Sequence, residues 1–170
     1  MKNIILVAGA TGNLGMRISR QLIKRGAEVR AIVRNSTNAE KIESLEKLGV
    51  AVVVLDMNDP EVIAIACEDV SCVVSAVAGL GNVIVDLQKT LLTGALQADL
   101  RRDFRNHIDS TSIQVTSIFN GCFADILMYN TPILNVKDKS IGFWGDKRYW
   151  KLDFTTMDDT AAYTAEAALD

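Results

Sequence analysis

Apolar and polar positions follow two alternating periods along residues 3–77. Short and almost continuous apolar runs are typical of strands that are buried on both faces of a parallel sheet. Such runs lie at 3–8, 28–33, 50–55 and 70–77. Between these runs, apolar residues recur with the spacing of a helix face. The predicted helices cover 13–25, 38–48 and a short segment that begins at Pro60. This strand–helix repeat predicts an α/β fold, a Rossmann-type doubly wound parallel sheet in three αβα layers.

The pattern beyond residue 82 is less regular. Apolar residues between 83 and 108 predict one long helix, or two helices joined near 97–99. Alternating residues predict a fifth strand over 112–118. Shorter patterns predict a helix over 122–129, a hairpin over 141–154 and an alanine-rich helix over 157–169, whose N-cap is Thr155 or Thr156.

The candidate chemistry lies in the loop between the first strand and the first helix. This loop reads Gly9-Ala10-Thr11-Gly12-Asn13-Leu14-Gly15, a GxxGxxG spacing. Gly9 permits a tight turn out of the strand, Gly12 lets the backbone approach a pyrophosphate, and Gly15 lets the helix pack close to the sheet. The helix N-terminus offers free N–H groups and a positive dipole end to phosphates. We therefore predict dinucleotide binding by Gly9, Thr11, Gly12, Asn13, Leu14 and Gly15.

The end of the second strand indicates which dinucleotide is bound. An acidic residue at that point would accept a hydrogen bond from the ribose 2′-hydroxyl of NAD. Here Arg34 follows Val33, and a guanidinium can pair with a 2′-phosphate and stack on adenine. We therefore predict that NADP(H) is preferred over NAD(H).

The third and fourth strands are followed by further candidate cofactor-binding residues. Asp56 and Met57 follow the third strand, where the chain would pass the adenine. Asp56 is a candidate acceptor for the adenine amino group, or else a capping residue before Pro60, and the sequence leaves both open. Small residues after the fourth strand would let the backbone line the central part of the cofactor; these are Ala76, Val77 and Ala78.

Composition indicates one folded domain. The 170 residues are 49% hydrophobic and have a mean hydropathy of +0.17, which excludes a disordered chain. We expect a single NAD(P)-binding domain over 1–170, with a cofactor-binding core at 1–98 and a shortened remainder at 99–170. The 18 basic and 21 acidic residues give a net charge of −3, so direct binding of nucleic acid is not expected.

Three features of the sequence bear on the cellular location of the protein and on metal binding: its apolar runs, its cysteines and its acidic clusters. No apolar run is long enough for a membrane span, and no cleavage pattern follows the first strand. Cys67, Cys72 and Cys122 lie in apolar stretches and are expected to be reduced and buried. Helix capping explains the acidic residues after Thr156. We therefore expect a cytoplasmic protein with no membrane contact and no metal site.

Five segments carry a family resemblance: GATGNLGMRI at 9–18, AIVRNS at 31–36, SAVAGLGNVIVDLQKTLL at 75–92, TSIQVTSIFNGCFADIL at 111–127 and FWGDKRYWKLDFTTMDDTAAYTAEAAL at 143–169. Together they resemble the NmrA-like and isoflavone-reductase-like group of atypical short-chain dehydrogenases/reductases. The resemblance implies hydride transfer between NADP(H) and a small organic substrate.

The chain departs from that family pattern in two places. Residues 96–98 run directly into 99–102, where family members place a further parallel strand and a loop that helps to shape the active site. The family pattern also continues beyond the alanine-rich helix, with residues that form much of the substrate pocket. We therefore expect a family member with an internal deletion and a C-terminal truncation.

No catalytic residue can be assigned from the sequence. The Tyr-x-x-x-Lys pair of the wider superfamily is absent, and the single histidine, His107, lies among charged residues on a predicted helix. Three interpretations stay open: a reductase, a non-catalytic redox sensor that acts through a protein partner, and a shortened product without activity. A shortened chain is expected to expose apolar surface and to form a homo-oligomer.

Overall fold

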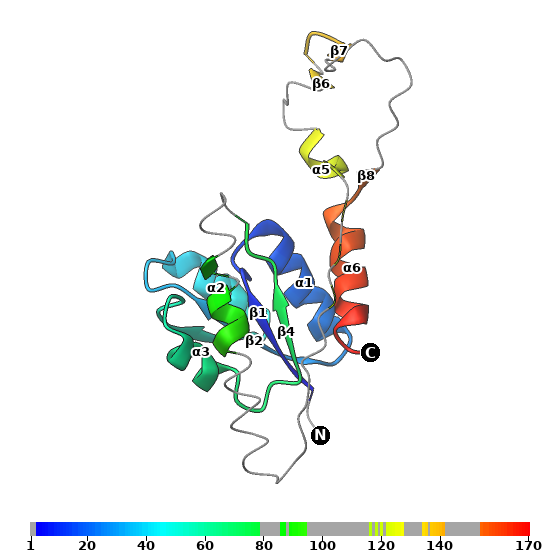
Figure 1. Cartoon of the computed structure of the whole chain (residues 1–170). Helices are drawn as coiled ribbons and strands as arrows, with labels where there is room; N and C mark the ends of the chain where they lie inside the picture. The colour runs from blue at the N-terminus through cyan, green and yellow to red at the C-terminus, as the bar shows by residue number, and fades with distance from the viewer. Residues whose placement is uncertain are drawn as a thin grey trace.

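The computed structural model describes residues 3–78, 86–87, 89–94, 116, 118, 120, 122–127, 134–135, 137–141 and 154–170. Its main body contains a parallel sheet of four strands (Figure 1). The strands are β1 (Ile4–Ala8), β2 (Glu28–Val33), β3 (Ala51–Val54) and β4 (Cys72–Ser75), in the order β3-β2-β1-β4. Ala8 is paired with Ile32 on one side and Ser75 on the other. The carboxyl ends of β1, β2 and β4 therefore meet at one edge of the sheet.

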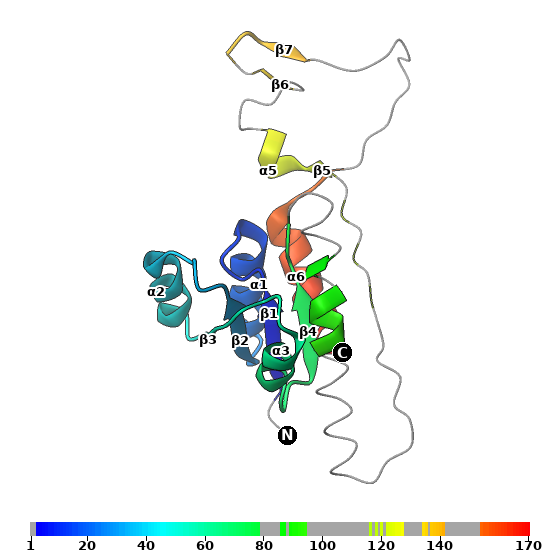
Figure 2. The ribbon, with the colours of Figure 1, turned by 60° about the vertical axis from the view of Figure 1, so that its left-hand side comes forward.

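Helices cover both faces of this sheet. One face carries α1 (Asn13–Lys24), α2 (Ala39–Lys47) and α6 (Met157–Ala167). The other face carries α3 (Pro60–Ala66) and the helical residues between 86 and 94 (Figure 2). The structure thus has the predicted three-layer αβα arrangement, and the Rossmann-type fold is confirmed.

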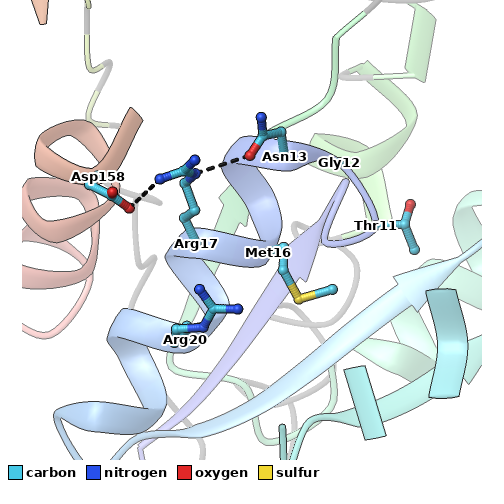
Figure 3. Close-up of a pocket in the computed structure, with 7 residues that line it drawn as sticks. All are labelled: Thr11, Gly12, Asn13, Met16, Arg17, Arg20 and Asp158. Carbon is cyan, nitrogen blue, oxygen red and sulfur yellow. Dashed lines mark hydrogen bonds and ion pairs between the residues drawn. The ribbon is translucent and has the colours of Figure 1, made fainter. Parts of the chain in front are cut away.

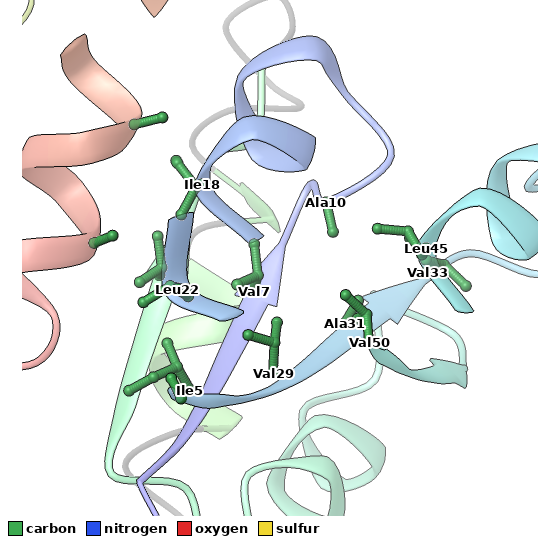
Figure 4. Packing of buried hydrophobic residues seen from close by; sticks show 14 residues of the cluster. Ile5, Val7, Ala10, Ile18, Leu22, Val29, Ala31, Val33, Leu45 and Val50 are labelled. Carbon is green, nitrogen blue, oxygen red and sulfur yellow. The ribbon is translucent and has the colours of Figure 1, made fainter. Parts of the chain in front are cut away.

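Alternating strand residues build two separate cores, because successive side chains of a strand point to opposite faces. Ile5, Val7, Val29 and Ala31 pack beneath α1 and α2 with Ile18, Leu22 and Leu45 (Figure 4). Leu6, Ala8 and Ile32 point the other way and pack with Leu55, Met57, Ile63 and Leu91. Both faces are apolar, which explains the continuous apolar runs in the sequence.

Helix α6 comes from the end of the chain and lies beside α1, the first helix (Figures 1 and 2). Small residues make this close packing possible: Ala161 and Ala165 are fully buried, as is Ser19 on α1. The Ser19 hydroxyl donates a hydrogen bond of 2.9 Å to the carbonyl oxygen of Gly15, within its own helix. At the far end of the pair, Arg25 Nε lies 3.1 Å from Glu166 Oε2.

A short helix and several short strands lie past the N-terminal end of α6, on the side away from the four-stranded sheet (Figure 1). Strand β5 (Cys122–Phe123) pairs in parallel with β8 (Phe154–Thr155), and α5 (Ala124–Leu127) follows β5 directly. Strands β6 (Leu134–Asn135) and β7 (Ser140–Ile141) form an antiparallel pair. None of the helices in these described ranges has the length and hydropathy of a membrane span.

Few predictions for the second half fall on described residues, and among them the helix predicted at 157–169 is confirmed as α6. Thr116 and Ile118 belong to the predicted strand 112–118, but neither is in a strand. The other residues of that predicted strand lie outside the described residues. The antiparallel pair that the structure describes turns at 137–139, whereas most of the hairpin predicted at 141–154 lies outside the described residues, as does much of the helix predicted at 83–108.

Candidate functional site

Gly9 leaves strand β1 in a conformation that other residues rarely adopt. Its φ angle is +83°, in the left-handed region that favours glycine. A Cβ atom on Gly9 would also lie 2.6 Å from the carbonyl oxygen of Ala76, which follows β4. The tight turn predicted at this position is confirmed, and it brings the loop against the end of the neighbouring strand.

The next two glycines of the loop have different surroundings. The Gly12 N–H donates a hydrogen bond of 3.0 Å to the carbonyl oxygen of Gly9 and closes the turn. Gly15 is buried, and a Cβ atom there would overlap the Gly9 carbonyl group. Gly15 therefore allows α1 to begin directly against the end of β1, as its spacing in the sequence predicts.

The N-terminus of α1 is open. Gly12 is its N-cap and has no side chain with which to cap the helix, and the first turn has no acidic residue. By contrast, Asn38, Asp59 and Thr156 cap α2, α3 and α6 with their side chains. The N–H groups of Asn13 to Gly15 precede the first helical hydrogen bond, so this end of α1 is suited to an anion.

An open cavity of about 400 Å³ lies beside the helix start (Figure 3). Its walls are formed by Thr11, Gly12, Asn13, Met16, Arg17, Arg20 and Asp158. Arg17 was not among the residues that the sequence singled out. Its position four residues after Asn13, on the same helix face, is the signal that could have found it.

Arg34 lies at the same edge of the sheet as the glycine loop. It follows β2 directly, and the register of β2 with β1 places it next to the residues that follow Ala8. The side chain is exposed, and its guanidinium makes no ion pair or hydrogen bond with the described residues. Arg34 can therefore meet a ligand without first losing a protein partner.

Asp56 is not the cap of α3, so that alternative from the sequence is wrong. Its Oδ1 accepts hydrogen bonds from the backbone N–H and the side-chain Nδ2 of Asn58, at 2.9 and 3.0 Å. The cap is Asp59, which accepts a bond of 2.9 Å from the N–H of Glu61. Asp59 directly precedes Pro60, the first residue of α3. Asp56 instead stabilises the turn that leads to Asp59.

Met57 and the residues after β4 can offer mainly their backbone to a ligand. The Met57 side chain is 5% exposed and packs in the core beneath α3. Ala76 continues the sheet, because its N–H donates a bond of 2.9 Å to the carbonyl oxygen of Ala8. Val77 packs against the core, and Ala78 is exposed. The segment 76–78 thus passes close to the glycine loop.

The two cysteines whose side chains the structure describes, Cys67 and Cys72, lack the lowered pKa of a reactive nucleophile, because burial raises the pKa of both thiols. Burial raises the pKa of the Cys67 thiol to about 11, against a weaker opposing effect of Arg30, so Cys67 stays neutral near pH 7. No group of three or more metal-ligating side chains occurs in the part of the chain that the structure describes. His107 and two of the three tyrosines lie outside that part.

Curated proteins of similar sequence include plant pinoresinol reductases. Pinoresinol reductase 1 of Arabidopsis thaliana is 27% identical over 99% of this chain and 65% of its own length. The probable pinoresinol-lariciresinol reductase 3 of the same plant is 30% identical over 99% of this chain and 64% of its own length. This chain therefore spans just under two thirds of these relatives. The alignment with the first relative extends over 209 positions, more than the 170 residues of the chain, so many positions of that relative have no counterpart here.

Solved structures show the same fold. AtPrR2 in its apo form has a TM-score of 0.74 and is 25% identical, with 99% of this chain and 67% of that chain covered. A second structure, of AtPrR2 with NADP+ and (+)pinoresinol, has a TM-score of 0.70 at 23% identity, over 100% of this chain and 67% of that one. The model of the NmrA-like family matches residues 1–104, which is more than half of the chain. With its glycine loop, its strand order and these relatives, the chain belongs to the NmrA-like family.

Proposed function

We propose that this chain binds NADP(H) across the carboxyl ends of β1, β2 and β4, and that it presents the nicotinamide to a small organic substrate. The observation that carries the proposal is the glycine loop: Gly9 and Gly15 leave no room for a Cβ atom, and the N-terminus of α1 is left without a side-chain cap. Such an arrangement is suited to a pyrophosphate, which the exposed N–H groups and the helix dipole would hold.

The residues along the sheet edge fit the other parts of the cofactor. The exposed guanidinium of Arg34 would pair with the 2′-phosphate, which favours NADP(H) over NAD(H). The turn at Asp56 and Met57 would lie at the adenine, with the Met57 backbone rather than its buried side chain available. The backbone of Ala76, Val77 and Ala78 would line the central part of the cofactor. Thr11 and Asn13, on the walls of the cavity, would flank the phosphates together with the backbone of Leu14.

Hydride transfer is the chemistry that a bound nicotinamide supplies. One related structure holds both NADP+ and (+)pinoresinol, and this supports a small organic substrate for the present chain. The roles left to this chain are to bind and orient the cofactor.

A second candidate function is a dinucleotide sensor that acts through a protein partner without turnover. It is favoured by the many positions of pinoresinol reductase 1 that have no counterpart here. Exposed apolar side chains on α5, β8 and α6 would suit a partner or a second copy of the chain; they are Ile126, Phe154 and Tyr163.

Fluorescence titration of the purified chain with NADPH tests the proposal. Saturable binding is expected, and its absence would overturn both candidate functions. A panel of carbonyl and enone compounds, with (+)pinoresinol included, then separates the two. Consumption of NADPH, followed by its absorbance, supports the reductase, whereas tight binding without consumption by any compound supports the sensor.

A further inference from the structure

Arg17 joins the glycine loop to the start of the last helix (Figure 3). Its Nε donates a hydrogen bond of 3.0 Å to Asn13 Oδ1, at the first position of α1. Its Nη1 lies 2.6 Å from Asp158 Oδ1, in the first turn of α6. One guanidinium thus contacts the loop and α6 at the same time, which its fork of donors allows.

A second carboxylate, that of Asp125 on α5, lies near the same guanidinium. Asp125 Oδ1 is 3.9 Å from Arg17 Nη2, and Asp125 Oδ2 accepts a bond of 2.8 Å from the N–H of Met157. The Arg17 side chain is only 27% exposed. Two carboxylates therefore offset its charge and restrict where it can move.

The bond from Arg17 determines how the Asn13 carboxamide is oriented. Only the oxygen of a carboxamide can accept from Arg17 Nε, so the nitrogen Nδ2 must point to the other side. Figure 3 shows Oδ1 toward Arg17 and Nδ2 away from it. Asn13 is exposed, on the wall of the cavity and beside the open helix N-terminus. Its Nδ2 is a hydrogen-bond donor, as an anion at this helix end requires.

We propose that Arg17 is a positioning residue for dinucleotide binding, which holds the Asn13 carboxamide with its donor group available to the pyrophosphate. The inference rests on the proposed function of the glycine loop. Without Arg17, the carboxamide can turn by half a rotation and present an acceptor oxygen, which repels a phosphate. The Arg17 charge is already paired with Asp158, so its role differs from that of a cation that binds the phosphate directly.

A double-mutant cycle on NADPH affinity tests this role. Arg17→Met is expected to weaken NADPH binding by about ten- to hundredfold, the cost of one hydrogen bond to a charged group. In an Asn13→Ala background the same substitution should have no further effect, because the carboxamide it positions is gone. Adenosine 2′-monophosphate, which lacks the pyrophosphate, should compete equally well in the wild type and in Arg17→Met.

The matched control is Arg25→Met. This substitution also removes an arginine and its ion pair with Glu166 of α6, but at the end of α1 that is remote from the glycine loop. Its NADPH affinity should equal that of the wild type. If Arg17→Met does not fold, as judged by circular dichroism, Arg17→Leu takes its place in the cycle, because leucine also has no donor for Asn13.

The outcomes separate this inference from the proposed function. If the wild type binds NADPH and Arg17→Met binds it with the same affinity, the inference is overturned, whereas the proposal of NADP(H) binding stands. The inference is also overturned if Arg17→Met weakens NADPH binding equally in the Asn13→Ala background, or if it weakens binding of adenosine 2′-monophosphate to the same extent. Either result would mean that the substitution disturbs the whole binding site and not the Asn13 carboxamide in particular. No NADPH binding by the wild type overturns both.

Discussion

The carbonyl group of Gly9 occupies the space in which a Cβ atom of Gly15 would stand. This contact joins the end of β1 to the first turn of α1, and both partners are backbone atoms. Neither can move aside without shifting a strand of the sheet or a helix that packs on it. The closeness of these two residues therefore determines where the open end of α1 lies.

Gly15→Ala should destabilise the fold. The added methyl group meets backbone that cannot rotate away, so we expect a loss of about 1–3 kcal/mol in the free energy of unfolding. Urea denaturation followed by circular dichroism measures it. Gly12→Ala is the matched comparison: its Cβ atom would lie 3.3 Å from the same Gly9 oxygen, a tight contact but a much milder one than at Gly15, so its loss of stability should be clearly smaller. Equal stability of Gly15→Ala and the wild type would contradict the packing described.

Gly12→Ala should instead affect cofactor affinity. Gly12 is exposed at the start of α1, where the backbone would approach the pyrophosphate. We expect NADPH binding to weaken on the order of tenfold, with the fold preserved. Titration of NADPH fluorescence measures the change. Unaltered affinity in a folded Gly12→Ala variant would place the pyrophosphate elsewhere.

Arg34→Glu should separate the two dinucleotides. A carboxylate at this position repels a 2′-phosphate and accepts a bond from a 2′-hydroxyl, so NADPH binding should weaken about ten- to hundredfold while NADH binding holds or improves. Titrations with both cofactors, run side by side, measure the ratio of affinities. Lys24→Glu makes the same charge change at the far end of α1 and should leave that ratio unaltered. Equal losses for NADPH and NADH would rule out a role for Arg34 at the 2′-phosphate.

Thr156→Ala should loosen the start of α6. The Thr156 hydroxyl accepts a bond of 3.0 Å from the N–H of Asp159 and lies 2.7 Å from its carboxylate. Loss of this cap should cost about 1 kcal/mol of unfolding free energy, whereas Thr156→Ser keeps the hydroxyl and should behave as the wild type. Thermal unfolding of the three proteins gives the comparison, and an unstable serine variant would speak against capping as the cause.

Stability should fall with rising pH in the range where Cys67 titrates. Burial raises the pKa of this thiol from 9.0 to about 11. Below pH 9.0 the thiol is neutral in both states, and between these two values the unfolded chain loses a proton that the folded chain keeps. The free energy of unfolding therefore decreases through this window. The decrease should be smaller in Cys67→Ala, as urea unfolding at a series of pH values would show; parallel curves for the two proteins would assign the decrease to other groups.

Much of the first half could be predicted from the sequence because its signals are local. Apolar runs and helical spacing depend on neighbours within a few residues, and strands β1 to β3 lie within the predicted ranges. The tight turn at Gly9 is local as well and was predicted, and Thr156 is one of the two residues that the sequence offered as the cap of α6. Strand β4 is shorter than its apolar run, since pairing with β1 begins only at Cys72.

The sequence is a weaker guide where a residue's role depends on distant parts of the chain. Thr116 and Ile118, the two described residues of the strand predicted at 112–118, are not in a strand. Met57 follows a strand as a ligand-binding residue would; the sequence did not indicate that its side chain packs in the core beneath α3 and leaves only its backbone for a ligand. The spacing of apolar residues does not indicate which distant part of the chain a segment will pack against.

The sequence by itself determined that this chain forms βαβ units and begins its first helix with an open, glycine-lined N-terminus. Those properties follow from backbone conformation and from short-range apolar spacing. Only the tertiary structure decided that α6 packs beside α1, and that Arg17 lies between Asn13 and Asp158. The physical reason is that this arrangement joins residues more than a hundred positions apart, and the burial of small side chains between the two helices is what brings them together.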